Sequence, residues 1–92
     1  MYHQQSGKKT ILFEVRPAGQ AGDVRVAGTF SDWQPVPMTR RKDGKFACEV
    51  PAPSTGTFEY MYLVDGKWVI DPDHSRWSVS EMGTINSMGE VQ

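Results

Sequence analysis

Residues 57–64 read TFEYMYLV, the stretch that decides the fold. Successive side chains of an extended strand point to opposite faces, so every second residue shares a face. One face collects large apolar side chains, namely Phe58, Tyr60, Tyr62 and Val64. The other collects Glu59, Met61 and Leu63. This alternation predicts a β-strand with a buried aromatic face, and it places Met61 on the outward face.

Other short stretches have the same character, and no stretch carries a helical apolar period over ten residues. The further strands are expected at residues 10–16, 23–29, 36–40, 45–50 and 67–70 and from Ile85 onward. Asp43-Gly44 and Asp65-Gly66 are typical hairpin turns between them. In the strand at 45–50, Phe46, Cys48 and Val50 should point inward. The sequence therefore predicts an all-β fold, an immunoglobulin-like β-sandwich of about seven short antiparallel strands.

The chain has 92 residues, which is the length of one small domain. Its first nine residues are mostly polar, so we expect 1–9 to be a flexible N-terminal tail and 10–92 to be a single module. No apolar run approaches the roughly 20 residues that span a bilayer, and no signal peptide is evident. A cytoplasmic location and no membrane partner are the expectations.

Charge and residue counts argue against several function classes. Ten Lys and Arg balance eleven Asp and Glu, which is the wrong ratio for a protein that neutralises phosphates, so we expect no nucleic-acid partner. The single Cys48 excludes an internal disulfide, and two histidines offer little for zinc. No cofactor and no metal are therefore expected.

Three tryptophans fall in expected loops or near a hairpin tip, where the core alone does not account for them. They are Trp33, Trp68 and Trp77. Each could cap one end of a thin core, or together they could form an aromatic platform. Flat pyranose faces pack on indoles, while their hydroxyls need polar partners at the rim. Thr84 and Asn86, two residues apart, offer a hydroxyl and an amide on one side of an extended chain, although they could equally serve ordinary strand entry.

Three motifs in order carry a family resemblance: VRVAGTFSDWQPVPM at 24–38, FEYMYLVDGKWVIDPD at 58–73 and EMGTINSMGEV at 81–91. Together they resemble the glycogen-binding domain of the AMP-activated protein kinase β subunit. That domain is similar to the isoamylase-type early-set carbohydrate-binding modules of glycogen-branching and debranching enzymes. The resemblance covers residues 22–91 and implies an early-set sandwich that binds α-1,4-glucans without catalysis.

The resemblance also implies roles for individual residues. Trp33 and Trp68 match the indoles that stack on glucose rings. Thr84 and Asn86 match the polar pair that bonds sugar hydroxyls, and Met82 matches an apolar side chain that packs against the glucan. Met61 is a departure, because the kinase-type domains carry lysine there, and a sugar-hydroxyl donor is missing unless Lys67 or Arg76 replaces it.

Other chemistries have weaker support in the residues. The carboxylates Asp32, Asp43, Asp65 and Asp71 sit in turn-like settings, where Asp commonly bonds its own backbone, so a glycosidase pair is not expected. Asp71, Asp73 and His74 could offer three metal ligands, and the basic residues at 40–45 could meet nucleic acid, but both read more simply as turns. Cys48 reads as a buried, inert thiol.

The main alternative function is of another class. Early-set domains also serve as structural or protein-interaction units of a glucan-metabolising enzyme or a kinase complex, with weak or no sugar binding. Burial of Trp33 or Trp68 would favour that alternative. Exposure of both on one continuous face would favour a sugar platform.

Overall fold

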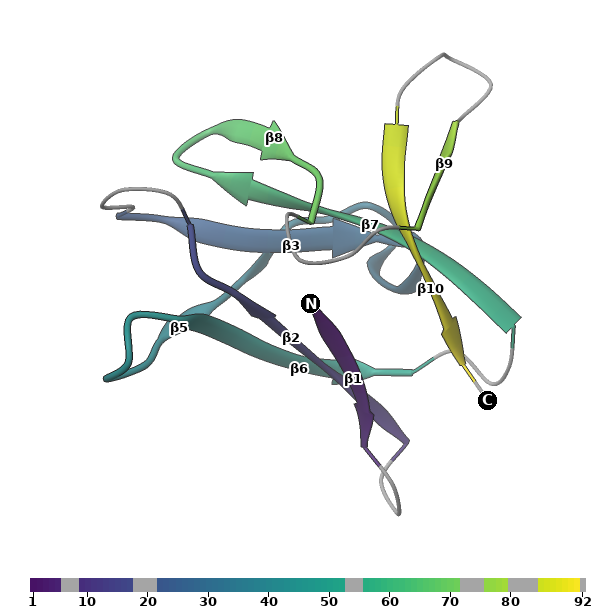
Figure 1. Ribbon diagram of the computed structural model, residues 1–92, viewed down its shortest axis with the longest axis horizontal. Helices are drawn as coiled ribbons and strands as arrows, with labels where there is room; N and C mark the ends of the chain where they lie inside the picture. Colours follow the sequence, from purple (N-terminus) through teal and green to yellow (C-terminus); the bar gives the residue numbers. More distant parts are fainter. Residues whose placement is uncertain (6–8, 18–21, 53–55, 72–75, 80–84, 92) are drawn as a thin grey trace.

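The computed structural model describes the chain except residues 6–8, 18–21, 53–55, 72–75, 80–84 and 92 (Figure 1). The described residues form strands and one 3₁₀ turn, in the order β1 (Tyr2–Gln5), β2 (Thr10–Val15), β3 (Val24–Gly28), η1 (Thr29–Ser31), β4 (Val36–Pro37), β5 (Thr39–Arg40), β6 (Phe46–Pro51), β7 (Gly56–Val64), β8 (Lys67–Val69), β9 (Trp77–Val79) and β10 (Ile85–Val91). The predicted all-β class is confirmed.

Two antiparallel sheets make the sandwich (Figure 1). One sheet has the order β1-β2-β6-β5, and the other has the order β4-β3-β7-β10-β9. The short strand β8 also pairs with β7, over Tyr62 to Val64. Because β3 pairs with those same residues of β7, β8 must lie on the opposite edge of β7. Strand β10 pairs with that same edge nearer the start of β7, from Gly56 to Tyr60. The strand β7 is therefore central to the larger sheet.

The strand expected at 36–40 is divided between the sheets. β4 pairs with β3 in the larger sheet, and β5 pairs with β6 in the smaller one. Met38 lies between them and is buried in the core. The chain turns a corner of the sandwich here, so one continuous sequence pattern yields two short strands.

Two strands were not expected from the sequence. β1 pairs with β2 from Tyr2 opposite Phe13 to Gln5 opposite Thr10, so the expectation of a flexible tail over 1–9 differs from the structure there. The reason is Tyr2, whose ring packs edge-on against Phe58 with centroids 5.1 Å apart. β9 was missed because three residues are too few to carry a period.

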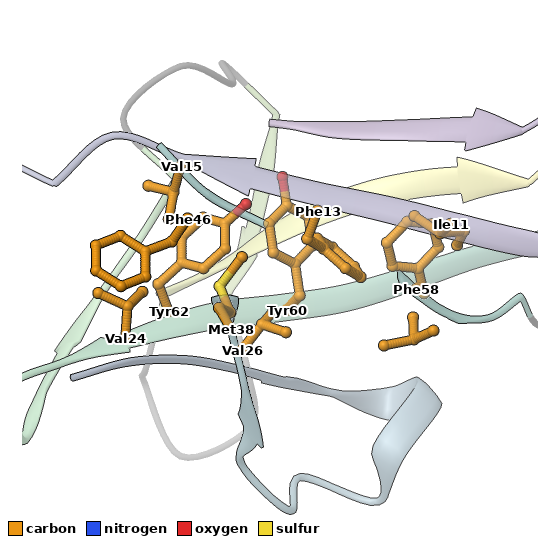
Figure 2. Close-up of a cluster of buried hydrophobic side chains, with 11 residues drawn as sticks. Ile11, Phe13, Val15, Val24, Val26, Met38, Phe46, Phe58, Tyr60 and Tyr62 are labelled. Atoms are coloured by element: carbon orange, nitrogen blue, oxygen red, sulfur yellow. The ribbon is translucent and has the colours of Figure 1, made fainter. Parts of the chain in front are cut away.

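The core lies between the two sheets, with tyrosine and phenylalanine rings of β2 and β7 at its centre (Figure 2). Its buried members are Ile11, Phe13, Val15, Val24, Val26, Met38, Phe46, Val50, Phe58, Tyr60 and Tyr62. The alternation predicted for β7 is confirmed, since Phe58, Tyr60 and Tyr62 are buried. Cys48 is only half-buried against this cluster, and its burial raises the pKa of the thiol.

One buried carboxylate sits among the core tyrosines. Asp71 is 2% exposed, and the Tyr60 hydroxyl donates to its Oδ2 over 2.7 Å. The ammonium group of Met1 lies 2.5 Å from the same oxygen. The Asp71 N–H donates to Ser87 Oγ over 2.8 Å, which attaches the chain leaving β8 to β10. A buried charge with these partners is satisfied, so it holds the two segments together.

Candidate functional site

The outer face of the larger sheet carries the first tryptophan. Trp68 lies opposite Leu63 in the β7–β8 pairing, and paired residues share a face. Leu63 belongs to the outward set of β7, so Trp68 points outward as well. The left-handed backbone of Asp65 (φ 47°) and Gly66 (φ 84°) closes the tight hairpin that brings β8 back along β7. The Trp68 side chain is 49% exposed.

Asn86 belongs to the same face. The next residue, Ser87, lies opposite Tyr60 and so points into the core, which turns Asn86 outward. Its amide Nδ2 donates to Glu59 Oε1 over 3.4 Å. Asn86 is nonetheless only 6% exposed, so it lies deeper than a residue at an open rim.

The buried Asp71 fixes β8 relative to Asn86. Its N–H bonds Ser87, the residue next to Asn86, while the chain between Trp68 and Asp71 is only two residues long. The indole and the amide are therefore carried by segments that are bonded to each other. A rigid spacing of this kind is what a ligand platform needs.

Trp33 sits in a strained turn after η1. Asp32 (φ 55°) and Trp33 (φ 60°) both adopt the left-handed region, which costs a bulky residue about 1–3 kcal/mol. The Trp33 N–H donates to Gly28 O over 2.8 Å, and the side chain stays 37% exposed. Backbone strain of this kind clusters at functional positions of proteins.

The turn that carries Trp33 is attached to β7 at Glu59. The Glu59 N–H donates to Thr29 Oγ1 over 3.2 Å. A Cβ added to Gly28 would stand 2.2 Å from Glu59 O, so only glycine lets β3 end this close to β7. Glu59 therefore touches the Trp33 turn through its backbone and Asn86 through its side chain.

Met61 lies on the outward face of β7, as predicted, between Glu59 and Leu63, the residue opposite Trp68. It is half-buried and lies opposite Ala27 of β3, which is fully buried. The two cations considered as a replacement for the family's lysine differ in their placement. Lys67 lies opposite Val64, in the inward set, and Arg76 pairs with Glu90 over 3.3 Å.

Trp77 does not share this face. Its partner in β10 is Ser87, which points into the core, so Trp77 lies on the inner side of the sheet at its β9 edge. Val79 and Ile85 pair on the same side, and all three are exposed, with Trp77 at 56%. Trp68 and Trp77 therefore lie on opposite sides of the larger sheet, Trp68 on its outer face and Trp77 on its inner side at the β9 edge.

Two expected site residues, Met82 and Thr84, lie outside the described residues, as do Asp73 and His74 of the alternative metal set. Sequence reasoning did not single out Glu59, whose side chain accepts a hydrogen bond from Asn86. The alternation of TFEYMYLV could have indicated it, because Glu59 belongs to the outward set beside Met61.

Two of the four turn carboxylates, Asp65 and Asp43, accept hydrogen bonds from backbone N–H groups, whereas Asp71 is buried among the core tyrosines. Asp65 Oδ1 accepts from the N–H of Asp23 over 2.8 Å. Asp43 accepts from the N–H of Lys45, and this bond holds the pKa of the Asp43 carboxyl below its usual value.

The basic hairpin is partly engaged within the protein. Arg41 pairs with Glu14, and the Arg40 guanidinium lies 5.8 Å from the centroid of the Phe46 ring. In the part of the chain that the structure describes, no helix is long and apolar enough to cross a bilayer. Those same residues contain no group of three or more His, Cys, Asp or Glu arranged to hold a metal ion.

Comparison with known proteins places this chain in a class of glycogen recognition domains. Residues 11–92 match the family described as the glycogen recognition site of AMP-activated protein kinase, and the chain belongs to this family. The family match agrees with the resemblance stated from the three motifs.

Individual relatives agree with the family. The 5'-AMP-activated protein kinase subunit beta-1 of Sus scrofa is 32% identical over 77 residues, which cover 84% of this chain and 61% of the relative. The same subunit of Homo sapiens is 31% identical over 77 residues, covering 84% of this chain and 27% of the relative. Cruciform DNA-recognizing protein 1 of Saccharomyces cerevisiae strain RM11-1a is 35% identical over 69 residues, 71% of this chain and 15% of the relative. The chain thus spans only part of the length of these relatives.

Proposed function

We propose that this chain is a non-catalytic module that binds α-1,4-glucans such as glycogen, starch and maltooligosaccharides. Trp33 and Trp68 stack on glucose rings, and Asn86 and Thr84 bond sugar hydroxyls, with Met82 packing against the glucan. The observation that carries the proposal is that two indoles, 37% and 49% exposed, remain at the surface of a domain small enough to need them in its core.

The attachments within the site support the same function. The Trp33 turn and Asn86 are both bonded to Glu59, and Asp71 holds the segment that carries Trp68. A module built this way would bind a rigid ring face without rearranging, which lowers the entropy cost of binding. Met61 in place of the family's lysine predicts an affinity below that of a site with the lysine donor, by about 1.5–3 kcal/mol at most.

The test is retention on amylose or glycogen beads, with β-cyclodextrin as the soluble competitor. We expect retention that β-cyclodextrin reverses and that barely changes between about 50 and 200 mM salt, because a neutral glucan releases no counterions. Retention on nucleic acid with a steep salt dependence would instead favour the basic hairpin at 40–45. No retention on glucan at any salt would remove the proposed function.

A second candidate is an interaction domain of a kinase complex or a glucan-processing enzyme. The exposed apolar side chains of Trp77, Val79 and Ile85 at the β9 edge favour it. Exposure of Trp33 and Trp68 favours glucan binding over this alternative, since a domain used only for packing would bury at least one of them. The two roles use different faces and are compatible.

A further inference from the structure

We propose that Glu59 is a positioning residue of the glucan site: it holds the Asn86 amide so that the amide carbonyl oxygen faces the ligand. This inference rests on the proposed function. It assigns a role to a side chain that the sequence motifs do not single out.

The direction of the Asn86 amide follows from chemistry. A carboxylate has only acceptor atoms, so the group of Asn86 that faces Glu59 Oε1 must be the Nδ2 donor, at 3.4 Å. The Oδ1 atom of a planar amide then points away from Glu59. Asn86 is 6% exposed, so its side chain has little freedom to turn within the sheet.

The carbonyl oxygen must reach solvent. Within the described part of the chain, the bond to Glu59 is the one hydrogen bond of the Asn86 side chain. Among those residues, no buried side-chain nitrogen or oxygen lacks a partner. Asn86 Oδ1 is therefore not a buried, unsatisfied atom, and it presents an acceptor to a ligand hydroxyl.

Glu59 is itself well placed to fix this orientation. Its backbone N–H is bonded to Thr29, and its side chain is half-buried at the centre of the sheet. Met61, its neighbour on the same face, offers only a weakly accepting thioether sulfur, which is a poor partner for orienting Asn86. Because the bond to Thr29 uses the backbone, substitution of the Glu59 side chain leaves the Trp33 turn attached.

The experiment compares Glu59→Ala, Glu59→Gln, Asn86→Ala and the double variant Glu59→Ala/Asn86→Ala, with β-cyclodextrin binding measured by calorimetry. Gln offers a carbonyl that can accept from Nδ2, so Glu59→Gln should bind within about twofold of the wild type. Glu59→Ala should weaken binding by about two- to tenfold, the range of one hydrogen bond. The double variant should bind no more weakly than Asn86→Ala, because Glu59 acts through Asn86.

A second measurement uses no sugar. In NMR spectra of the free protein, the side-chain NH₂ resonances of Asn86 should move in Glu59→Ala and stay near their wild-type positions in Glu59→Gln. Losses that add in the double variant, or NH₂ resonances unchanged in Glu59→Ala, would overturn the positioning role while leaving glucan binding intact. A wild type that binds no β-cyclodextrin would overturn the proposed function, and this role with it.

Discussion

Trp68→Ala and Trp77→Ala form a matched pair that tests which face binds glucan. The two indoles are similarly exposed, at 49% and 56%, and each lies on a strand of three residues. Each substitution removes an indole that is about half exposed, so each should lower the free energy of unfolding by about 2 kcal/mol, roughly half the cost of a fully buried one. Their effects on binding should differ, because Trp68 lies on the outer face with Asn86 and Trp77 on the inner side.

Stacking of a ring on an aromatic side chain is worth about 1–3 kcal/mol, taking stacked nucleic-acid bases as the nearest measured case. Trp68→Ala should therefore weaken β-cyclodextrin binding by about 5- to 150-fold, while Trp77→Ala should leave it within about twofold. Calorimetric titration gives the affinities, and thermal unfolding checks that both variants remain folded. Equal losses in the two variants, or no loss in Trp68→Ala, would refute the assignment of the glucan to the outer face.

Two further predictions concern the neighbouring residues of β7. Met61→Lys should tighten β-cyclodextrin binding by up to about tenfold, because a half-buried outward position lets the lysine stem lie along the sheet while its ammonium donates to the sugar. A loss of several kcal/mol of stability in that variant would instead mean that this face packs against other parts of the protein. Burial and the bond to Asp71 raise the pKa of the Tyr60 hydroxyl above its usual value of 10.0, so folding stability should be full below about pH 10 and fall above it by about 1.4 kcal/mol per pH unit. Urea unfolding at pH 9 and 11 should show this fall in the wild type, and a fall that is as steep in Tyr60→Phe would contradict the assignment.

Local patterns predicted the strands that have a strong period. Residues 57–64 alternate so regularly that both the strand and the directions of Tyr60 and Met61 follow from them. The two hairpin turns were equally predictable, because Asp-Gly allows the left-handed backbone seen at Asp65 and Gly66.

Features that depend on tertiary contacts were out of reach. The strand expected at 36–40 divides because the chain passes from one sheet to the other at Met38. The residue pattern of 36–40 contains no signal for this change of sheet. The ring of Tyr2 stabilises β1 by packing against Phe58, which is more than 50 positions away in the sequence. Cys48 alternates like a core residue, yet it lies only half-buried.

The site residues also divide into those that a local motif indicates and those that only tertiary contacts reveal. Motifs could indicate Trp33, Trp68 and Asn86 as ligand groups, but not how they are held in place. The bonds that hold them run through Glu59 and Asp71, and these partners become visible only once β7, β8 and β10 are paired.

Strand β7 supplies the core and the proposed glucan site from alternate residues of one stretch. Tyr60 and Tyr62 point inward and are fully buried, so substitutions there act first on folding. Glu59 and Met61 point outward, so we expect substitutions there to act first on binding of the proposed ligand. The two sets meet at Ser87, which receives the Asp71 N–H on the core side while the adjacent Asn86 faces Glu59 on the other. A shift of β10 by one residue would exchange Ser87 and Asn86 between the faces, losing the buried bond and the ligand acceptor together. The register of β10 against β7 therefore decides whether Asn86 lies on the outer face, where the proposed glucan site requires it.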